Sequence, residues 1–235
     1  MASAPELVTA RRATVHHQPL HATLPATAAQ PRYKRPLDVV AGVTLLGLSA
    51  PLFGVVALLV KLTSRGPVLF RQERLGRDRR PFVVYKFRTM RPDADPAPHR
   101  EYFKQYLSGA HAPDQPRQLY KLRRDPRITP VGGLLRRLGL DELPQLINVV
   151  RGDMSIVGPR PPLDYEVEHY SGRHLARLSV KPGITGLWQI RGRDMVDFET
   201  MVDMDLEYIG SQSLWLDLRI MLMTVPALLW SFIRH

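Results

Sequence analysis

Residues 140–150 read Leu-Asp-Glu-Leu-Pro-Gln-Leu-Ile-Asn-Val-Val, an acidic pair followed by an apolar helical pattern. Leu143, Ile147 and Val150 recur at helical spacing, and a proline such as Pro144 is tolerated only in a first turn. The pattern therefore predicts a helix that begins close to Asp141. A helix N-terminus stabilises an ionised carboxylate through the helix dipole and free N–H groups, so Asp141 is expected either to cap this helix or to be an ionised reactive group.

A second carboxylate, Glu142, follows Asp141 directly. Two adjacent carboxylates repel unless a cation or a proton lies between them. Mg²⁺ is commonly bound through one or two carboxylates together with substrate phosphates. The pair therefore predicts a nucleotide-substrate site with Mg²⁺ as cofactor, held by Asp141 and Glu142. A glycosidase pair is disfavoured, because neighbouring helical side chains cannot flank a glycosidic bond.

Cations that could hold phosphate groups lie both before and after this pair. Residues 68–72 and 82–88 are expected to form two strands, and alternation in the second places Lys86 and Arg88 on one face. Arg160 lies in a turn-rich strip of glycine and proline, and Arg193 ends another glycine-rich stretch. A phosphate site and an ordinary solvated surface both fit these cations, so the pattern alone leaves both open.

An apolar segment near the N-terminus is long enough to cross a bilayer. Residues 39–60 contain no charge, and a spanning helix needs about 20 residues. Pro51 lies near the middle, and cations flank both ends, whereas a spanning helix normally has its Lys/Arg excess on one side. These features favour a re-entrant helix-break-helix segment with both ends cytoplasmic; an ordinary single-pass anchor is the alternative.

Composition limits the partners of the rest of the chain. A net charge of +11 indicates an anionic partner such as nucleic acid, a membrane surface or phosphorylated substrates. The absence of cysteine excludes disulfides and thiol chemistry. The chain has no aromatic-interleaved basic strands of the kind that bind RNA, so nucleic acid is not expected. Residues 1–31 are expected to form a flexible tail, and residues 220–233, which contain Pro226, an interfacial helix too short to span.

Taken together, these segments resemble the bacterial sugar transferases, in particular the small monotopic phosphoglycosyl transferases. The resemblance extends from about Lys34 to the C-terminus. The matching segments, in chain order, are Lys34-Arg35-x-x-Asp38, Gly66-Pro67-Val68, Gln72-x-Arg74-x-Gly76, Lys86-Phe87-Arg88-Thr89-Met90, Leu140-Asp141-Glu142-Leu143-Pro144-Gln145, Gly152-Asp153-Met154-Ser155, Val157-Gly158-Pro159-Arg160-Pro161, Pro182-Gly183-Ile184-Thr185-Gly186 and Gly192-Arg193.

The resemblance implies a two-step transfer of a sugar 1-phosphate from a UDP-sugar to undecaprenyl phosphate, with release of UMP. Asp141 would be the nucleophile that carries the phosphosugar, and Glu142 would help to bind Mg²⁺. Substrate would be bound by five residues: Lys86, Arg88, Gln145, Arg160 and Arg193. The expected location is the cytoplasmic face of the bacterial inner membrane, in contact with phospholipids.

The resemblance also implies an α+β, mainly helical fold with a short β-hairpin and interfacial amphipathic helices. Its expected parts are a tail (1–31), a re-entrant hairpin (32–65) broken at Pro51, and a catalytic domain (66–235). Two positions depart from the family. The break reads Ser49-Ala50-Pro51, with serine one residue away from its usual place, and Gly139 stands where a larger residue is usual.

Two other functions remain open from the sequence. A glycosyl transferase would release UDP instead of UMP, and a membrane-anchored basic scaffold or binding protein would show no turnover. The sequence does not identify the sugar among glucose, galactose and N-acetylhexosamines. It also leaves open the glycan pathway, the role of residues 1–31 and the oligomeric state, a homo-oligomer included.

Overall fold

The computed structural model describes residues 30–91, 97, 100, 101, 103, 125–191 and 197–234, with backbone alone for residues 231–234. The predicted tail, apart from its last residues, and Arg193 lie outside this part of the chain. The elements are α1 (Lys34–Thr63), β1 (Leu69–Leu75), η1 (Arg77–Arg79), β2 (Pro81–Phe87), α3 (Pro130–Leu138), η2 (Leu140–Glu142), α4 (Gln145–Arg151), β3 (Ser155–Val157), α5 (Asp164–Val167), α6 (Gly172–Leu175), η3 (Ala176–Ser179), β4 (Gly183–Thr185), α7 (Leu187–Arg191), α8 (Phe198–Gly210) and α9 (Leu214–Arg234).

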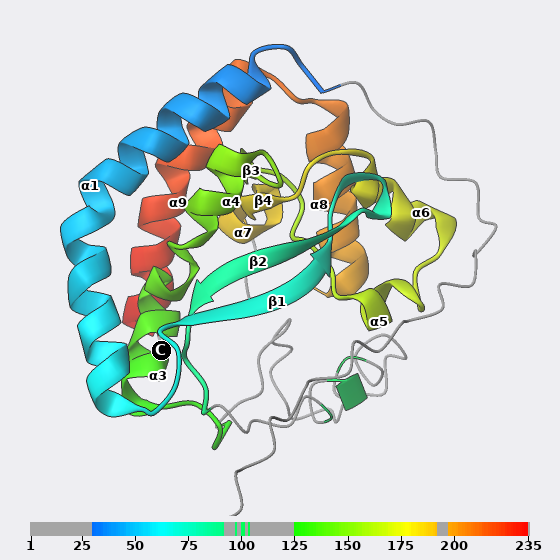
Figure 1. Ribbon diagram of the computed structural model, residues 1–235. Coiled ribbons are helices and arrows are strands. Elements are labelled where there is room, and N and C mark those ends of the chain that lie inside the picture. The colour runs from blue at the N-terminus through cyan, green and yellow to red at the C-terminus, as the bar shows by residue number, and fades with distance from the viewer. Residues whose placement is uncertain are drawn as a thin grey trace, which may run out of the picture.

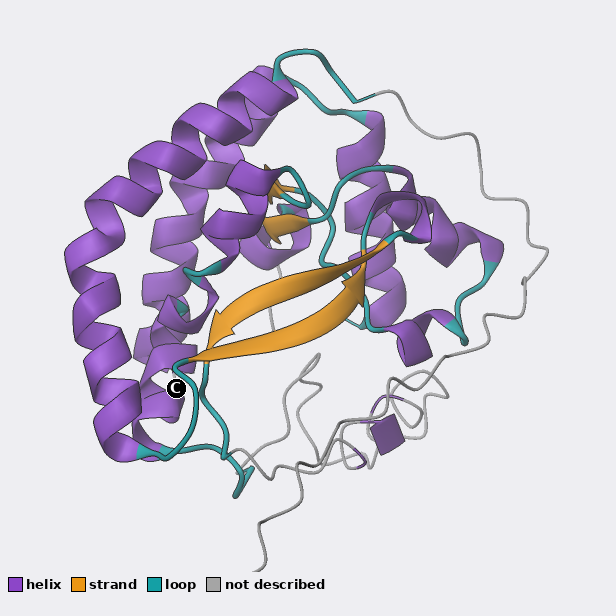
Figure 2. Ribbon diagram, in the orientation of Figure 1, coloured by secondary structure: helices purple, strands orange, loops and turns teal. Residues whose placement is uncertain are grey.

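Helices make up most of the described chain, as predicted (Figure 2). Two small sheets accompany them: the antiparallel hairpin β1–β2 and the parallel pair β3–β4. Figure 1 shows α1 and α9 along one side of the molecule and α5, α6 and α8 on the other, with the hairpin crossing between them. The contacts agree: α1 packs on α4 and β3, α9 packs on α7 and β3, and α3 touches both long helices.

The apolar helix α1 does not end at Pro51. Its 30 residues, about 45 Å of helix, form one element with the proline inside, so the expected break into two helices is not observed. A proline at this position leaves the carbonyl of Gly47 without its usual donor. The Ser49 hydroxyl bonds to the Leu45 carbonyl at 2.6 Å instead, so it does not compensate for the proline.

Most apolar side chains of α1 point away from the domain. Val40, Leu48 and Leu62 are 67%, 76% and 73% exposed, although leucine and valine are normally buried. Among the described residues, α1 is the one helix whose length and hydropathy would allow it to cross a membrane. Such a large apolar surface on a protein marks a contact with lipid or with a partner.

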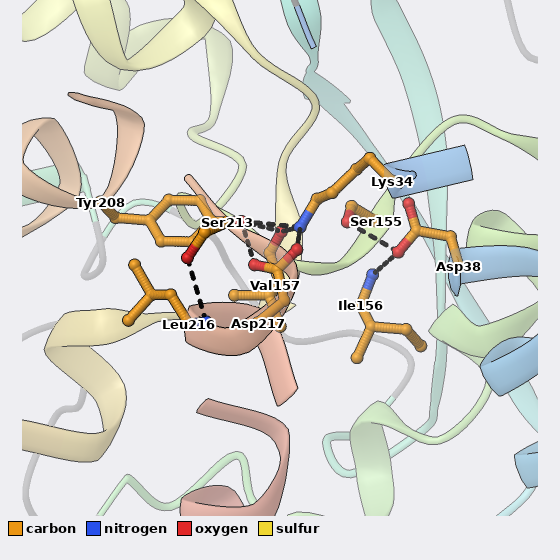
Figure 3. Close-up of polar contacts among 9 residues, drawn as sticks. All are labelled: Lys34, Asp38, Ser155, Ile156, Val157, Tyr208, Ser213, Leu216 and Asp217. Carbon is orange, nitrogen blue, oxygen red and sulfur yellow. Dashed lines mark hydrogen bonds and ion pairs between the residues drawn. The ribbon is translucent and has the colours of Figure 1, made fainter. Parts of the chain in front are cut away.

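The start of α1 is tied to the domain by a buried polar cluster (Figure 3). The Lys34 ammonium donates to Asp217 Oδ2 at 2.8 Å, to the Tyr208 hydroxyl at 2.6 Å and to the Val157 carbonyl at 2.8 Å. Lys34 and Asp217 are only 3% and 0% exposed. Because a buried charge is costly unless it is paired, this cluster fixes the starts of α1 and α9 against β3.

One turn further along, Asp38 makes a second tie between α1 and β3. Its Oδ1 accepts from the Ser155 hydroxyl at 2.8 Å and from the Ile156 N–H at 2.9 Å. Both contacts are drawn in Figure 3. The first turns of α1 therefore have a fixed position relative to β3.

The end of α1 is tied down as well, by Arg88. Its guanidinium donates to the Ser64 carbonyl and hydroxyl, both at 2.8 Å, and to the Pro67 carbonyl. Ser64 is the C-cap residue of α1, and Arg88 is 5% exposed. Both ends of α1 are thus attached to the same folded unit by polar contacts.

The hairpin β1–β2 matches the two predicted strands, and Asn148 of α4 fixes its position. The fully buried Asn148 amide accepts from the Tyr85 N–H at 3.1 Å and donates to the Val83 carbonyl at 2.7 Å. On the strand face that carries Val84 and Lys86, Val84 is fully buried in one cluster with Leu146 and Val149 of α4, and Lys86 is paired with Glu142. The solvated-face interpretation of Lys86 is wrong for this reason.

Candidate active site

The acidic pair lies on a short turn between two helices. Gly139 ends α3 with a left-handed φ of 70°, a conformation that glycine adopts without a Cβ penalty. Asp141 and Glu142 then form the 3₁₀ turn η2, and α4 begins only at Gln145. Pro144 is the N-cap residue of α4 and makes no side-chain cap hydrogen bond.

Asp141 is therefore not the cap of the following helix, and the expectation that the helix end holds it ionised is wrong. Burial, followed by the charge of Glu142, raises the pKa of Asp141 to about 6, although Lys86 and Arg136 act in the opposite direction. A carboxylate with a raised pKa is more basic than an ordinary aspartate. Such perturbed groups are concentrated at functional sites.

Glu142 lies in the opposite electrostatic environment. Its Oε1 is 2.9 Å from Lys86 Nζ and 3.7 Å from Arg160 Nη1. Burial by itself would raise the pKa of Glu142, but the two cations lower it to about 2. The pKa of Asp141 is therefore raised while the pKa of Glu142 is lowered. Opposite shifts in two neighbouring carboxyl groups indicate that the two groups have different chemical roles.

The structure brings most of the predicted site residues together. Lys86 reaches the pair from β2, Arg160 from the strip after β3, and Gln145, 3% exposed, from the first turn of α4. The strip is held by β3–β4 pairing, in which the Gly158 N–H donates to the Thr185 carbonyl at 2.9 Å. A Cβ on Gly158 would lie 2.6 Å from the Lys181 carbonyl, so the close approach depends on glycine.

Two predicted residues are not placed at the pair. Arg88 follows β2 but its guanidinium is occupied at the end of α1, where it bonds to Ser64 and Pro67. The Arg88 N–H still donates to the Val68 carbonyl at 2.9 Å, so the hairpin pairing reaches Arg88 and brings its side chain beside the end of α1. Arg193 lies outside the described residues.

Sequence reasoning missed two cations near the pair. Arg74 of β1 donates to the Pro161 carbonyl at 2.6 Å, next to Arg160, and its charge lowers the pKa values of Lys86 and Glu142. Arg136 of α3 lines the same cavity as Asp141 and opposes the rise in its pKa. Arg74 lay within a matched motif and Arg136 in a basic helical turn, but neither pattern shows that the chain folds them onto the acidic pair.

A cavity of about 860 Å³ opens above Asp141. One end is polar and includes Lys86, Arg136, Asp141, Glu142 and Arg160. The remaining wall is formed mainly by apolar side chains of α1 and α9. A cavity of this size is typical of ligand sites, in which a few polar groups orient a ligand inside an apolar wall.

Comparison with known proteins identifies the family. The family model of the bacterial sugar transferases matches residues 29–231. The chain is 43% identical over 194 residues to the exopolysaccharide production protein ExoY of Rhizobium meliloti, covering 83% of this chain and 84% of that protein. It is 44% identical over 214 residues to the UDP-glucose:undecaprenyl-phosphate glucose-1-phosphate transferase of Caulobacter vibrioides, covering 88% of this chain and 73% of that protein.

Some relatives are much longer than this chain. The undecaprenyl-phosphate galactose phosphotransferase of Salmonella typhimurium is 40% identical over 198 residues, which are 83% of this chain but 40% of that protein. The extent of the family match and the identities above show that the chain belongs to the bacterial sugar transferase family and is a transferase. A scaffold without catalysis is thereby set aside.

Proposed function

We propose that the chain transfers a sugar 1-phosphate from a UDP-sugar to undecaprenyl phosphate through a phosphosugar intermediate on Asp141. The observation that carries this proposal is the cavity, in which a half-buried carboxylate with a raised pKa and a cation cluster lie at one end of an apolar space. The relatives named for undecaprenyl phosphate support the choice of acceptor. Such a reaction would begin the lipid-linked assembly of an exopolysaccharide, capsule, O-antigen or glycoprotein glycan.

In the first step, a carboxylate oxygen of Asp141 attacks the β-phosphorus of the UDP-sugar. The bond from that phosphorus to the oxygen bridging the two phosphates breaks, and UMP leaves with the oxygen and its electron pair. In the second step, a phosphate oxygen of the lipid attacks the same phosphorus and displaces the Asp141 carboxylate. The products are the lipid diphosphate sugar and free enzyme, and neither step requires a proton to be removed from the attacking group.

Charge neutralisation is the main task of the surrounding residues. Lys86 and Arg160 already contact the oxygen of Glu142, so they lie beside the position that the donor phosphates would take. Positioning and electrostatic stabilisation account for most of phosphoryl-transfer catalysis. Gln145 and Arg136 border the same space and would help to bind the two phosphorylated substrates.

The family also implies Mg²⁺. Asp141 and Glu142 fit this ion as a partial ligand set that substrate phosphates would complete. No cluster of three or more His, Cys, Asp or Glu residues occurs in the described ranges, so these residues form no all-protein cage. Asp141 and Glu142 can supply the one or two carboxylates that Mg²⁺ takes when substrate phosphates complete its shell. When bound, the ion would neutralise charge on the donor diphosphate.

The nucleotide product tests the proposed reaction. With UDP-glucose or UDP-galactose and Mg²⁺ but no lipid, the enzyme should release about one equivalent of UMP per chain and then stop, as expected for a covalent half-reaction. Addition of undecaprenyl phosphate should restart UMP release. Release of UDP would instead indicate a glycosyl transferase and would refute the proposal.

This acceptor-free release of UMP should depend on pH through Asp141. Since the attacking carboxylate must be ionised and its pKa lies at about 6, the rate should fall as the pH drops through about 6. Glu142→Gln removes a neighbouring negative charge, so its rate profile should shift to lower pH. A rapid-quench measurement of UMP release across pH 6 checks both the wild-type profile and its shift in Glu142→Gln. A rate that does not change with pH, or a profile that moves to higher pH in Glu142→Gln, would contradict the assignment of Asp141 as the attacking carboxylate.

We further propose that α1 enters the membrane from one side as a single curved helix, without the expected break, and that both of its ends lie on the cytoplasmic face (Figure 1). The support is that Lys34 at its start and Ser64 at its end are both bonded to the catalytic part of the chain. One folded unit with a charged site cannot hold the two ends of a helix on opposite sides of a bilayer. The apolar side chains between these ends would enter the hydrocarbon region from that side.

Single-cysteine labelling in cells tests this topology. The chain has no cysteine, so cysteines introduced at the exposed positions Arg32 and Arg65 are unique reporters. Both should be protected from a membrane-impermeant maleimide in intact spheroplasts and should react after the membrane is permeabilised. Protection of one position and reaction of the other in intact spheroplasts would show that α1 crosses the membrane.

A further inference from the structure

The apolar part of the cavity lies between α1 and α9. Leu48 and Leu52 of α1 line it on one side, and Met221, Leu222 and Val225 of α9 line it on the other. None of the residues that these two helices contribute to the cavity is charged. We call this space, bounded by these five side chains, the α1/α9 groove.

The α1/α9 groove opens toward the apolar surface of the molecule. Leu48 and Leu222, on opposite walls, are 76% and 74% exposed, so both extend from the cavity to the outside. Trp215 and Trp230 of α9 are also exposed, at 76% and 68%. Exposed tryptophans on a helix are typical of membrane interfaces, where an apolar ring with a polar N–H is favoured.

At its inner end, the groove meets the turn that carries Asp141. A Cβ on Gly139 would lie 2.7 Å from Leu228 Cδ2, so the Leu228 side chain of α9 lies directly against this turn. Thr224 of α9 is also hydrogen-bonded to Thr185 of β4 at 2.8 Å, which fixes the helix beside the strand that pairs with β3.

We propose that the α1/α9 groove binds the prenyl chain of the lipid acceptor and delivers its phosphate to Asp141 past Gly139 and Leu228. The inference rests on the proposed function and adds a binding location for the prenyl chain of the acceptor. It is supported by continuity: one cavity joins an uncharged apolar wall to a cluster of cations that suits an anionic head group. An acyl chain of a phospholipid fits the apolar wall alone, but it would not require the connection to the nucleophile.

Two adjacent residues of α9 provide a matched test. Leu222 lines the groove, whereas Met223 does not, and both are substantially exposed, at 74% and 48%. Leu222→Asn and Met223→Asn therefore make the same kind of change on two faces of one helix. Both variants would be assayed in nanodiscs with undecaprenyl phosphate and with a short farnesyl phosphate as acceptors, and acceptor-free UMP release would be measured in parallel.

Leu222→Asn is expected to raise the KM for undecaprenyl phosphate by roughly tenfold, since loss of one buried leucine contact weakens binding by about that factor. The increase should be smaller for farnesyl phosphate, while Met223→Asn should leave both values unchanged. Acceptor-free UMP release should remain at the wild-type level in both variants. Equal effects of the two substitutions on KM, or an unchanged KM in Leu222→Asn, would overturn the α1/α9 groove as the site of the prenyl chain. Absence of UMP release in the wild-type enzyme would refute the proposed function itself.

Discussion

Replacement of Asp141 by asparagine is expected to lower turnover by a factor on the order of 10⁴ or more, because the nucleophile is lost and the adjacent carboxylate, Glu142, is already paired with Lys86 and Arg160. The amide is nearly isosteric with the carboxylate but cannot form the phosphosugar ester. Lys86 and Arg160 would still face Glu142, so donor binding should be largely kept. Steady-state formation of lipid diphosphate sugar measures the loss.

Stability separates this loss from misfolding. The pKa of the half-buried Asp141 carboxyl is raised to about 6 in the folded state. Above that pH the carboxyl is ionised in an environment that disfavours its charge, so it destabilises the fold at pH 7. Asp141→Asn should therefore melt at the wild-type temperature or above it. Asp164→Asn, an exposed change at the start of α5, should alter neither activity nor melting. Substantial turnover in purified Asp141→Asn would exclude covalent catalysis by this residue.

The largest effect on stability is expected from the Lys34 cluster. Lys34→Met leaves Asp217 buried and unpaired, and removal of one partner of a buried ion pair costs about 3–5 kcal/mol. In a chain of this length that corresponds to a drop in the melting temperature of about 10 °C. Thermal unfolding of the protein in nanodiscs, followed by intrinsic fluorescence, measures it.

The double variant Lys34→Met with Asp217→Leu tests the cause. Because the remaining charge is removed as well, its melting temperature should recover toward the wild-type value. Glu207→Gln serves as the matched control, since its partner Arg191 forms an exposed pair, 50% and 51% accessible, worth at most about 1 kcal/mol. If the single variant melts like this control, the buried cluster is not what anchors α1.

The sequence predicted the parts of the fold that depend on local pattern. The apolar segment around Pro51 and the hairpin strands lie where hydrophobicity and alternation placed them, and a helix follows the acidic pair, although it begins at Gln145 and not at Asp141. The proline did not interrupt the helix, because the loss of one backbone hydrogen bond and local bending can be tolerated within a long apolar helix.

The tertiary consequences could not be read from local pattern. Lys86 and Arg88 are two residues apart, yet one contacts Glu142 and the other the end of α1, because different distant segments of the chain pack beside each of them. The pKa of Asp141 likewise depends on burial by distant elements and not on its place before α4. The ion pair of Lys34 with Asp217 joins residues far apart in the chain, so neither side chain alone indicates it.

The most direct test of covalent transfer through Asp141 is the intact mass of the protein after incubation with a UDP-sugar and Mg²⁺ in the absence of lipid acceptor. The wild-type chain should gain the mass of one phosphosugar, and the added mass should disappear when undecaprenyl phosphate is supplied. Asp141→Asn should show no added mass, while Asp164→Asn should behave like the wild type. An adduct that persists in Asp141→Asn, or lipid-linked product formed by wild-type enzyme that never acquires the added mass, would contradict the mechanism.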